Sequence, residues 1–65
     1  MVTVDDKVRF DAFRDIKGEE RFVTTGTVYA VNYAHQVFHV IYYAGDTAQR
    51  TSFKFCDIGE KVRVV

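Results

Sequence analysis

The 65-residue chain contains no proline and a single cysteine, Cys56. One cysteine excludes an intramolecular disulfide, so the chain is not a disulfide-stabilised secreted scaffold. No run approaches the ~18 consecutive apolar residues that a membrane helix requires, and no signal-peptide segment is visible. Nine Lys+Arg balance nine Asp+Glu, which argues against a strongly basic nucleic-acid coat protein. We therefore expect a soluble, cytoplasmic protein without a membrane partner.

Aromatic side chains are abundant by contrast, with six Phe and four Tyr. With 48% hydrophobic residues, the composition is too apolar for a disordered chain. A chain of this length buries only ~60% of the surface that its unfolded form exposes, so the aromatic residues must supply much of the core. We expect one domain over residues 1–65, and a dimer is one way to complete so small a core.

Apolar and polar residues alternate with a period of two, which is typical of half-buried strands. Five such segments are expected, over residues 7–11, 22–33, 37–43, 49–55 and 60–65. The charged residues 12–21 predict a long loop between the first two strands, or a ragged hairpin with its tip at Lys17–Gly18, rather than a helix. Gly26 indicates a bulge or sharp bend inside the second strand, and Gly45 indicates a turn with positive φ. The sequence therefore predicts an all-β domain without a helix.

Two predicted hairpins fix which side of the sheet faces inward. A three-residue loop between the second and third strands would pair Ala30 with Val40. A two-residue turn before the fourth strand would pair Phe38 with Phe53. Both hairpins then place Phe38 and Val40 on one face, where small and large side chains alternate across the strands, as inside a small barrel.

The order of these segments resembles the Src-homology-3-like barrels. Four segments carry the likeness: residues 6–10 (DKVRF), 26–28 (GTV), 38–42 (FHVIY) and 57–62 (DIGEKV). The Gly-x-Val motif is similar to that of KOW-type and Tudor-type domains, and many short phage and mobile-element proteins look alike. The resemblance implies a five-stranded Src-homology-3-like barrel with a long loop between the first two strands and with the first and last strands adjacent.

The chain departs from these families at the positions that would bind a ligand. KOW-type domains surround their glycine with lysine and arginine, whereas Thr25 and Thr27 flank Gly26 here. Asp5 stands where such domains commonly place a turn glycine. The aromatic cage of Tudor domains has only a faint counterpart at Tyr43. No binding residue is therefore carried over from either family.

Catalytic and metal sites are not predicted. Cys56 is the only thiol, and we expect it to be packed before a tight turn, with nothing to bring it to His35 or His39. These three residues are a poor zinc set, because structural zinc takes four ligands in paired short spacings. The adjacent carboxylates at 5–6 and 19–20 point to opposite sides of an extended backbone. We expect no enzyme, no metal and no cofactor.

The predicted register gathers aromatic and polar side chains on the outward face of the three middle strands. The candidate binding residues on this face are Tyr29, Tyr33, His39, Ile41, Tyr43, Arg50 and Lys54, with Val31, Val37 and Ser52 between them. Tyrosine combines apolar area with a polar tip and is favoured at interfaces. We predict that a partner protein, or a second copy in a homodimer, binds here.

Two alternatives to this prediction stay open. The face would suit a nucleic acid if the tyrosines stacked on bases while Arg50 and Lys54 bound phosphates, although zero net charge disfavours this. Residues 12–21 would otherwise fold over the face and make it part of the core.

A second candidate surface follows from adjacent first and last strands. It contains four cations, Lys7, Arg9, Lys61 and Arg63. Such a patch would suit phosphate or an acidic protein surface. Neutralisation by Asp5, Asp11 and Glu60 would instead leave an ordinary solvated face, and we favour this interpretation.

Overall fold

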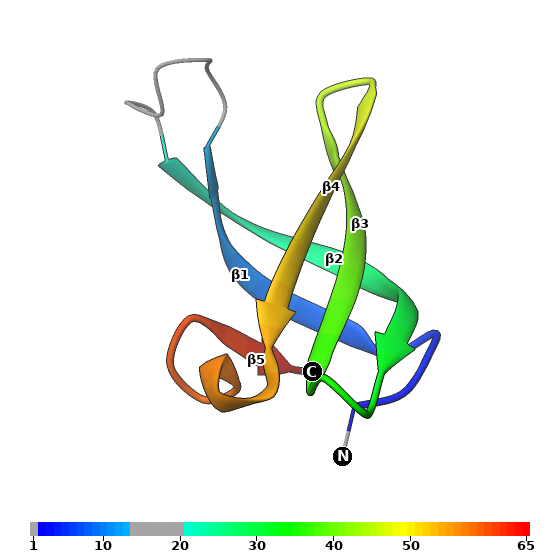
Figure 1. Ribbon diagram of the computed structural model, residues 1–65. Helices are drawn as coiled ribbons and strands as arrows, with labels where there is room; N and C mark the ends of the chain where they lie inside the picture. Colours follow the sequence, from blue (N-terminus) through cyan, green and yellow to red (C-terminus); the bar gives the residue numbers. More distant parts are fainter. Residues whose placement is uncertain (1, 14–20) are drawn as a thin grey trace.

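The computed structural model describes residues 2–13 and 21–65, which form a five-stranded antiparallel sheet (Figure 1). The strands are β1 (Lys7–Phe13), β2 (Arg21–Asn32), β3 (Val37–Ala44), β4 (Thr47–Lys54) and β5 (Val62–Val64), and one 3-10 turn, η1 (Phe55–Asp57), precedes β5. The order in the sheet is β4-β3-β2-β1-β5. The predicted all-β class is confirmed. The predicted closure into a barrel is not seen in the described residues, because β4 and β5 form two separate edges.

At the two ends of the segment predicted as a loop over residues 12–21, the described residues Ala12, Phe13 and Arg21 are in strands. Ala12 pairs with Phe22 and Phe13 pairs with Arg21, so β1 and β2 continue as a hairpin beyond the predicted ends. Residues 14–20, which include the predicted tip of this segment, lie outside the described residues.

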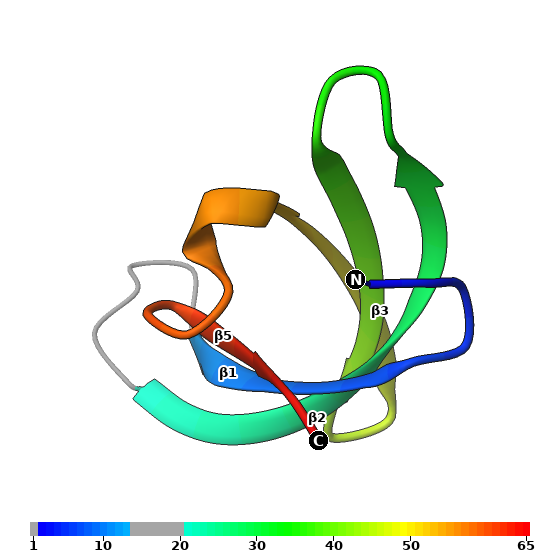
Figure 2. The same cartoon turned by 90° about the horizontal axis from the view of Figure 1, so that it is seen from below.

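The long strand β2 connects the two halves of the sheet. Its residues from Arg21 to Thr27 pair with β1, and those from Thr27 to Asn32 pair with β3. Figure 2 shows that β2 curves along its length, which carries β3 around one side of the sheet. A Cβ atom at Gly26 would lie 2.5 Å from Val40 Cγ1 and 2.8 Å from Ile41 O. Glycine is therefore needed here for the close approach of β3, and the predicted bulge lies elsewhere.

The bulge in β2 lies at Tyr29. Val28 pairs with Val40 and Ala30 pairs with His39, so Tyr29 is an extra residue without a partner on β3. An extra residue reverses the alternation of side chains along a strand. Val28 faces inward before the bulge and Val31, opposite Phe38, faces inward after it. The predicted pairing of Ala30 with Val40 is wrong for this reason.

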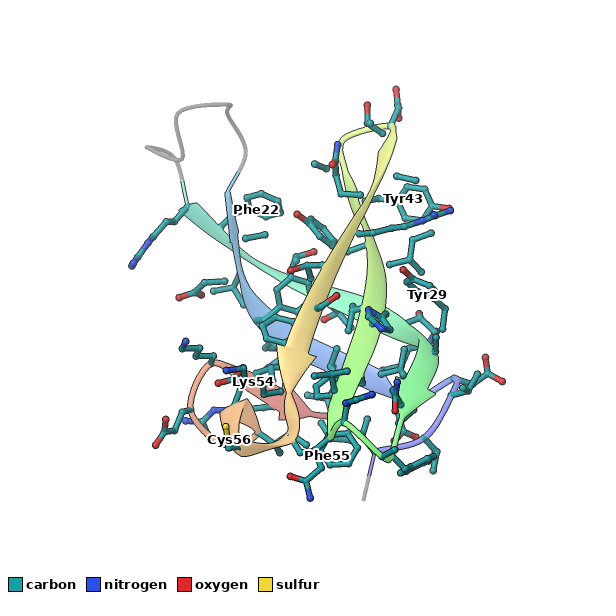
Figure 3. The ribbon with its side chains drawn as sticks, viewed as in Figure 1. Phe22, Tyr29, Tyr43, Lys54, Phe55 and Cys56 are labelled. Atoms are coloured by element: carbon teal, nitrogen blue, oxygen red, sulfur yellow. The ribbon has the colours of Figure 1, made fainter. Side chains whose placement is uncertain are left out.

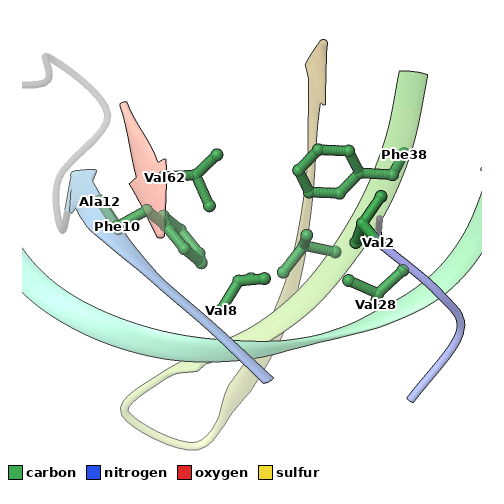
Figure 4. Packing of buried hydrophobic residues seen from close by; sticks show 8 residues of the cluster. Val2, Val8, Phe10, Ala12, Val28, Phe38 and Val62 are labelled. Atoms are coloured by element: carbon green, nitrogen blue, oxygen red, sulfur yellow. The ribbon is translucent and has the colours of Figure 1, made fainter. Parts of the chain in front are cut away.

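The core lies on the inner, concave side of the sheet (Figure 4). Its buried members are Val2, Val8, Phe10, Ala12, Val28, Phe38, Val40 and Val62. Phe38 is fully buried, and its ring centroid lies 5.7 Å from that of Phe53 and 6.1 Å from that of Phe55. The predicted pairing of Phe38 with Phe53 is confirmed, because the Gly45–Asp46 turn sets the register of β3 against β4. Gly45 has the predicted positive φ, 63°.

The first residues of the chain are fixed to β2 by main-chain hydrogen bonds. Asp5 N donates to Val28 O (2.8 Å), and Val28 N donates to Asp6 O (2.9 Å). Asp5 has a φ of 77°, the left-handed conformation that a turn glycine would adopt, and aspartate tolerates it better than most residues. This turn places Val2 in the core, ahead of the first predicted strand.

Replacement of Phe38 with alanine should lower the free energy of unfolding by about 3–5 kcal/mol, because it leaves a cavity among Phe53 and Phe55. That is a large part of the ~5–15 kcal/mol of a typical domain. Urea denaturation measures the loss. Tyr43→Ala, which removes an exposed ring from the same strand, is the control and should change stability far less. Equal losses in the two variants would contradict the inward position of Phe38.

Replacement of Gly26 with alanine should destabilise the fold by about 1–3 kcal/mol, because the new methyl group meets the main-chain oxygen of Ile41 as well as Val40. Thermal unfolding measures the difference. The neighbouring exposed Thr25→Ala serves as the control. A Gly26→Ala protein as stable as the Thr25→Ala protein would show that β3 does not pass so closely over β2.

Candidate binding surface

Positive and negative side chains are separated along the described chain. The five strands carry six cations, Lys7, Arg9, Arg21, Arg50, Lys54 and Arg63, and a single carboxylate, Asp11. The other described carboxylates lie in turns or in η1: Asp5, Asp6, Asp46, Asp57 and Glu60. Zero net charge therefore conceals strands that are predominantly basic. The whole-chain charge is a poor guide to the partner of the sheet.

Three side chains from β2, β3 and β4 meet on the outer face. The Arg50 guanidinium carbon lies 5.6 Å from the centroid of the Tyr29 ring, and the His39 ring lies 6.0 Å from it on the neighbouring strand. A hydrogen bond of 2.7 Å joins His39 Nδ1 and Ser52 Oγ. We call Tyr29, His39, Arg50 and Ser52 the Tyr29 cluster. The Tyr29 ring contacts its neighbours in this cluster while 43% of the residue stays exposed.

Two other predicted members of this face adjoin the cluster. Ile41 is half-buried and lies opposite Arg50 on β4 and Thr27 on β2. Tyr43 is 63% exposed and follows two residues later on β3. Figure 3 shows Tyr29 and Tyr43 on the same side of β3. The predicted β3–β4 half of the face is therefore present as a set of neighbouring side chains.

Lys54 does not join them. It pairs with Val37 at the opposite end of the β3–β4 hairpin from Tyr43. In Figure 3, Lys54 lies well away from Tyr29 and Tyr43. Four residues of extended strand separate it from Arg50, which is about 13 Å along the chain. Lys54 is therefore not part of the Tyr29 cluster.

Val31 and Tyr33 were predicted on this face and lie on the other side. Val31 packs against the core, opposite Phe38. Tyr33 Oη donates a hydrogen bond to Val2 O (3.0 Å), and its ring meets that of Phe55 edge-on at 6.0 Å. The bulge at Tyr29 is the physical reason, because it moves the side chains of the residues that follow it to the opposite face, up to the start of the turn at Tyr33. Tyr33 therefore contributes to the fold, although half of it remains exposed.

The predicted basic patch is present in part. Arg9 and Arg63 are direct partners across β1 and β5, and both line a pocket of about 230 Å³ together with Lys61. Lys7 is directed elsewhere, because its Nζ donates a hydrogen bond to Thr27 Oγ1 (2.8 Å). The first and last strands are thus adjacent, as predicted. Asp11 and Glu60, two of the three carboxylates predicted to neutralise this patch, also line the pocket.

The expected packing of Cys56 is wrong. The side chain is exposed on η1, because the 3-10 turn directs it outward (Figure 3). Among the described residues, no group of three His, Cys, Asp or Glu side chains is placed to hold a metal ion. The same part of the chain contains no helix long and apolar enough to cross a membrane.

Removal of the Tyr33 hydroxyl should destabilise the protein, because Val2 O would lose a partly buried hydrogen bond. We expect Tyr33→Phe to lower the free energy of unfolding by about 0.5–1.5 kcal/mol in urea denaturation. Tyr43→Phe, on an exposed ring of the same type, is the matched control and should have no measurable effect. Equal stability of the two variants would return Tyr33 to the candidate binding residues.

Comparisons with known proteins identify no relative whose function could guide the interpretation of the outer face. No protein-family model, no curated protein and no solved structure matches the chain. Nothing in these comparisons bears on the resemblance to Src-homology-3-like barrels or on a mobile-element origin. The function proposed for this chain must therefore follow from the outer face of its sheet.

Proposed function

We propose that the protein is a non-enzymatic binding module whose outer face, centred on the Tyr29 cluster, contacts an acidic surface of a partner protein. The observation that supports it is the exposed Tyr29 ring, with the His39 ring and the Arg50 guanidinium beside it. Tyrosine and arginine are among the residues that contribute most to protein interfaces. Side chains already held in place lose less conformational freedom on binding, which favours affinity.

The charge of the strands favours an acidic partner. Arg50 lies on the outer face beside Tyr29, and Asp11 is the only carboxylate on the described strands. Complementary charge accelerates association and rejects partners of the same sign. The proposal therefore specifies a partner with Asp or Glu around an apolar pocket that accepts a tyrosine.

A second copy of the chain is a weaker candidate partner. The inward positions of Val31 and Tyr33 leave a smaller apolar strip than the sequence predicts. In a twofold dimer the same basic strands would also face each other, and like charges oppose association. The homodimer is kept as an outcome of the test.

Nucleic-acid binding is the second candidate function, and the basic strands are the observation that favours it. Exposed tyrosines beside arginines suit single strands. At Tyr29, however, the Arg50 guanidinium already lies over the ring. A base would have to displace Arg50 or use the opposite side, whereas a protein pocket can accept the ring and the guanidinium together.

The fold family is part of the proposal. We assign the chain to the Src-homology-3-like barrels on the strand order, the β1–β5 pairing and the 3-10 turn before the last strand. The open edge between β4 and β5 is a departure from a closed barrel. Small β domains of this superfold host many unrelated functions, so the site and not the fold carries the functional proposal.

Loss of the Tyr29 cluster should abolish partner binding. The immobilised wild-type protein, a Tyr29→Ala/Arg50→Gln variant and a Gln49→Ala control are compared by quantitative capture from nuclease-treated extract. Gln49 adjoins Arg50 in sequence but faces the other side of β4, opposite Tyr42. We expect a protein that is retained by the wild type and the control, is lost with the double variant, and is released by raised salt.

Three outcomes would overturn the proposal. One is a set of captured proteins that does not differ between the control and the double variant. Another is tight binding of a labelled single-stranded oligonucleotide at low salt that the double variant loses, which identifies the nucleic-acid function instead. The third is a dimer in sedimentation equilibrium that Ile41→Lys converts to monomer, which identifies self-association.

A further inference from the structure

Two arginines face each other on the outer side of the β1–β5 pair. Arg9 and Arg63 are direct cross-strand partners, flanked on the inner face by the pairs Val8–Val64 and Phe10–Val62. Directly opposed side chains lie ~4.5–5.5 Å apart at Cβ, and like charges at this distance are destabilising. A pair of this kind needs compensation.

The described residues do not supply that compensation. No carboxylate among them lies within the 4.0 Å of an ion pair with Arg9 or Arg63; the ion pair found nearby joins Lys61 Nζ to Asp57 Oδ1, at 4.0 Å. Asp11 and Glu60 line the same pocket without closing on either guanidinium. Both arginines are exposed and free to turn toward a ligand.

The pocket between these residues has the size and charge for a small anion. Its volume is about 230 Å³, and its charged lining consists of Arg9, Lys61 and Arg63 with Asp11 and Glu60. Guanidinium groups bind phosphate through two parallel hydrogen bonds, and a lysine adds a mobile charge. Three cations and two carboxylates give this lining a net charge of +1, which attracts an anion in proportion to the charge of that anion. A phosphate group carrying about −1.5 to −2 charges is therefore attracted more strongly than an anion of single charge.

We infer that the Arg9–Arg63 pair is the centre of a phosphate-binding site on the outer face of β1 and β5. The site is separate from the Tyr29 cluster, which lies across β2, β3 and β4. Its chemistry fits a small dianionic phosphate, free or on a phosphate monoester. The phosphodiester backbone of a nucleic acid offers the same oxygens with one charge per group, and the experiment distinguishes these sources.

Titration with inorganic phosphate, followed by ¹H–¹⁵N NMR at constant ionic strength, tests the site. We expect saturable shifts at the amides of Arg9, Lys61 and Arg63, and none with acetate. Arg63→Gln should weaken phosphate binding about tenfold, the effect of losing one charge-assisted interaction. Glu60→Gln should strengthen it, because a carboxylate leaves the pocket. Lys54→Gln removes one positive charge outside the pocket and is the matched control.

Thermal unfolding separates loss of the site from loss of the fold. In phosphate-free buffer Arg63→Gln should be at least as stable as the wild type, since it removes the opposed charges. Phosphate should then raise the melting temperature of the wild type more than that of Arg63→Gln. Lower stability of Arg63→Gln without phosphate would contradict the uncompensated pair.

The source of the phosphate is resolved by a second ligand. A short single-stranded oligonucleotide that binds more tightly than inorganic phosphate, and is lost in Arg63→Gln, supports the site and identifies a phosphodiester ligand. Binding of inorganic phosphate without the oligonucleotide supports a small phosphate. Absence of saturation with both ligands, or an equal loss in Lys54→Gln, overturns the inference.

Discussion

The extra residue in β2 at Tyr29 determines which side chains of this protein build the core and which meet solvent. Before it, Val28 points inward; after it, Val31 and Tyr33 do. Without the bulge, two apolar positions would leave the core, and Tyr33 could not reach Val2 or Phe55. The bulged residue itself is left outward beside His39 and Arg50. The same irregularity thus completes the interior and creates the exposed aromatic cluster.

Sequence patterns predicted the part of the fold that tight turns control. The Gly45 turn leaves one register for β3 against β4, so the contact of Phe38 with Phe53 and the outward position of Ile41, Tyr43 and Arg50 followed from alternation alone. The bulge was not predictable in the same way, because Tyr29 and its neighbours alternate acceptably in either register. Gly26 drew attention as the irregular residue, yet its role is to admit Val40 at close range. A glycine in a strand can mark either a bulge or the close approach of another strand, and only the three-dimensional packing distinguishes the two.

Charge along the chain has a spatial order that composition does not reveal. The described carboxylates other than Asp11 lie in turns or in η1, where Asp6 accepts a hydrogen bond from Thr3 N (2.9 Å) and Asp57 accepts one from Lys54 N (3.0 Å). Asp6 and Asp57 close turns in this way, and Asp11 is the one carboxylate on the described strands. The local geometry of aspartate therefore polarises a chain whose total charge is zero. Both proposed surfaces depend on this separation.

The strand β4 lies at one edge of the sheet, and its outer side is exposed to other protein molecules. No strand of the described part of the chain pairs with the outer edge of these eight residues, and open edges of this kind promote association with the strands of other molecules. Arg50 and Lys54 place charge on this edge, and its other outward residues, Ala48 and Ser52, are small. An incoming strand would have to bury these cations. We therefore expect the positive charge on β4 to oppose such association and to constrain the replacements tolerated at Arg50, even in the absence of a ligand.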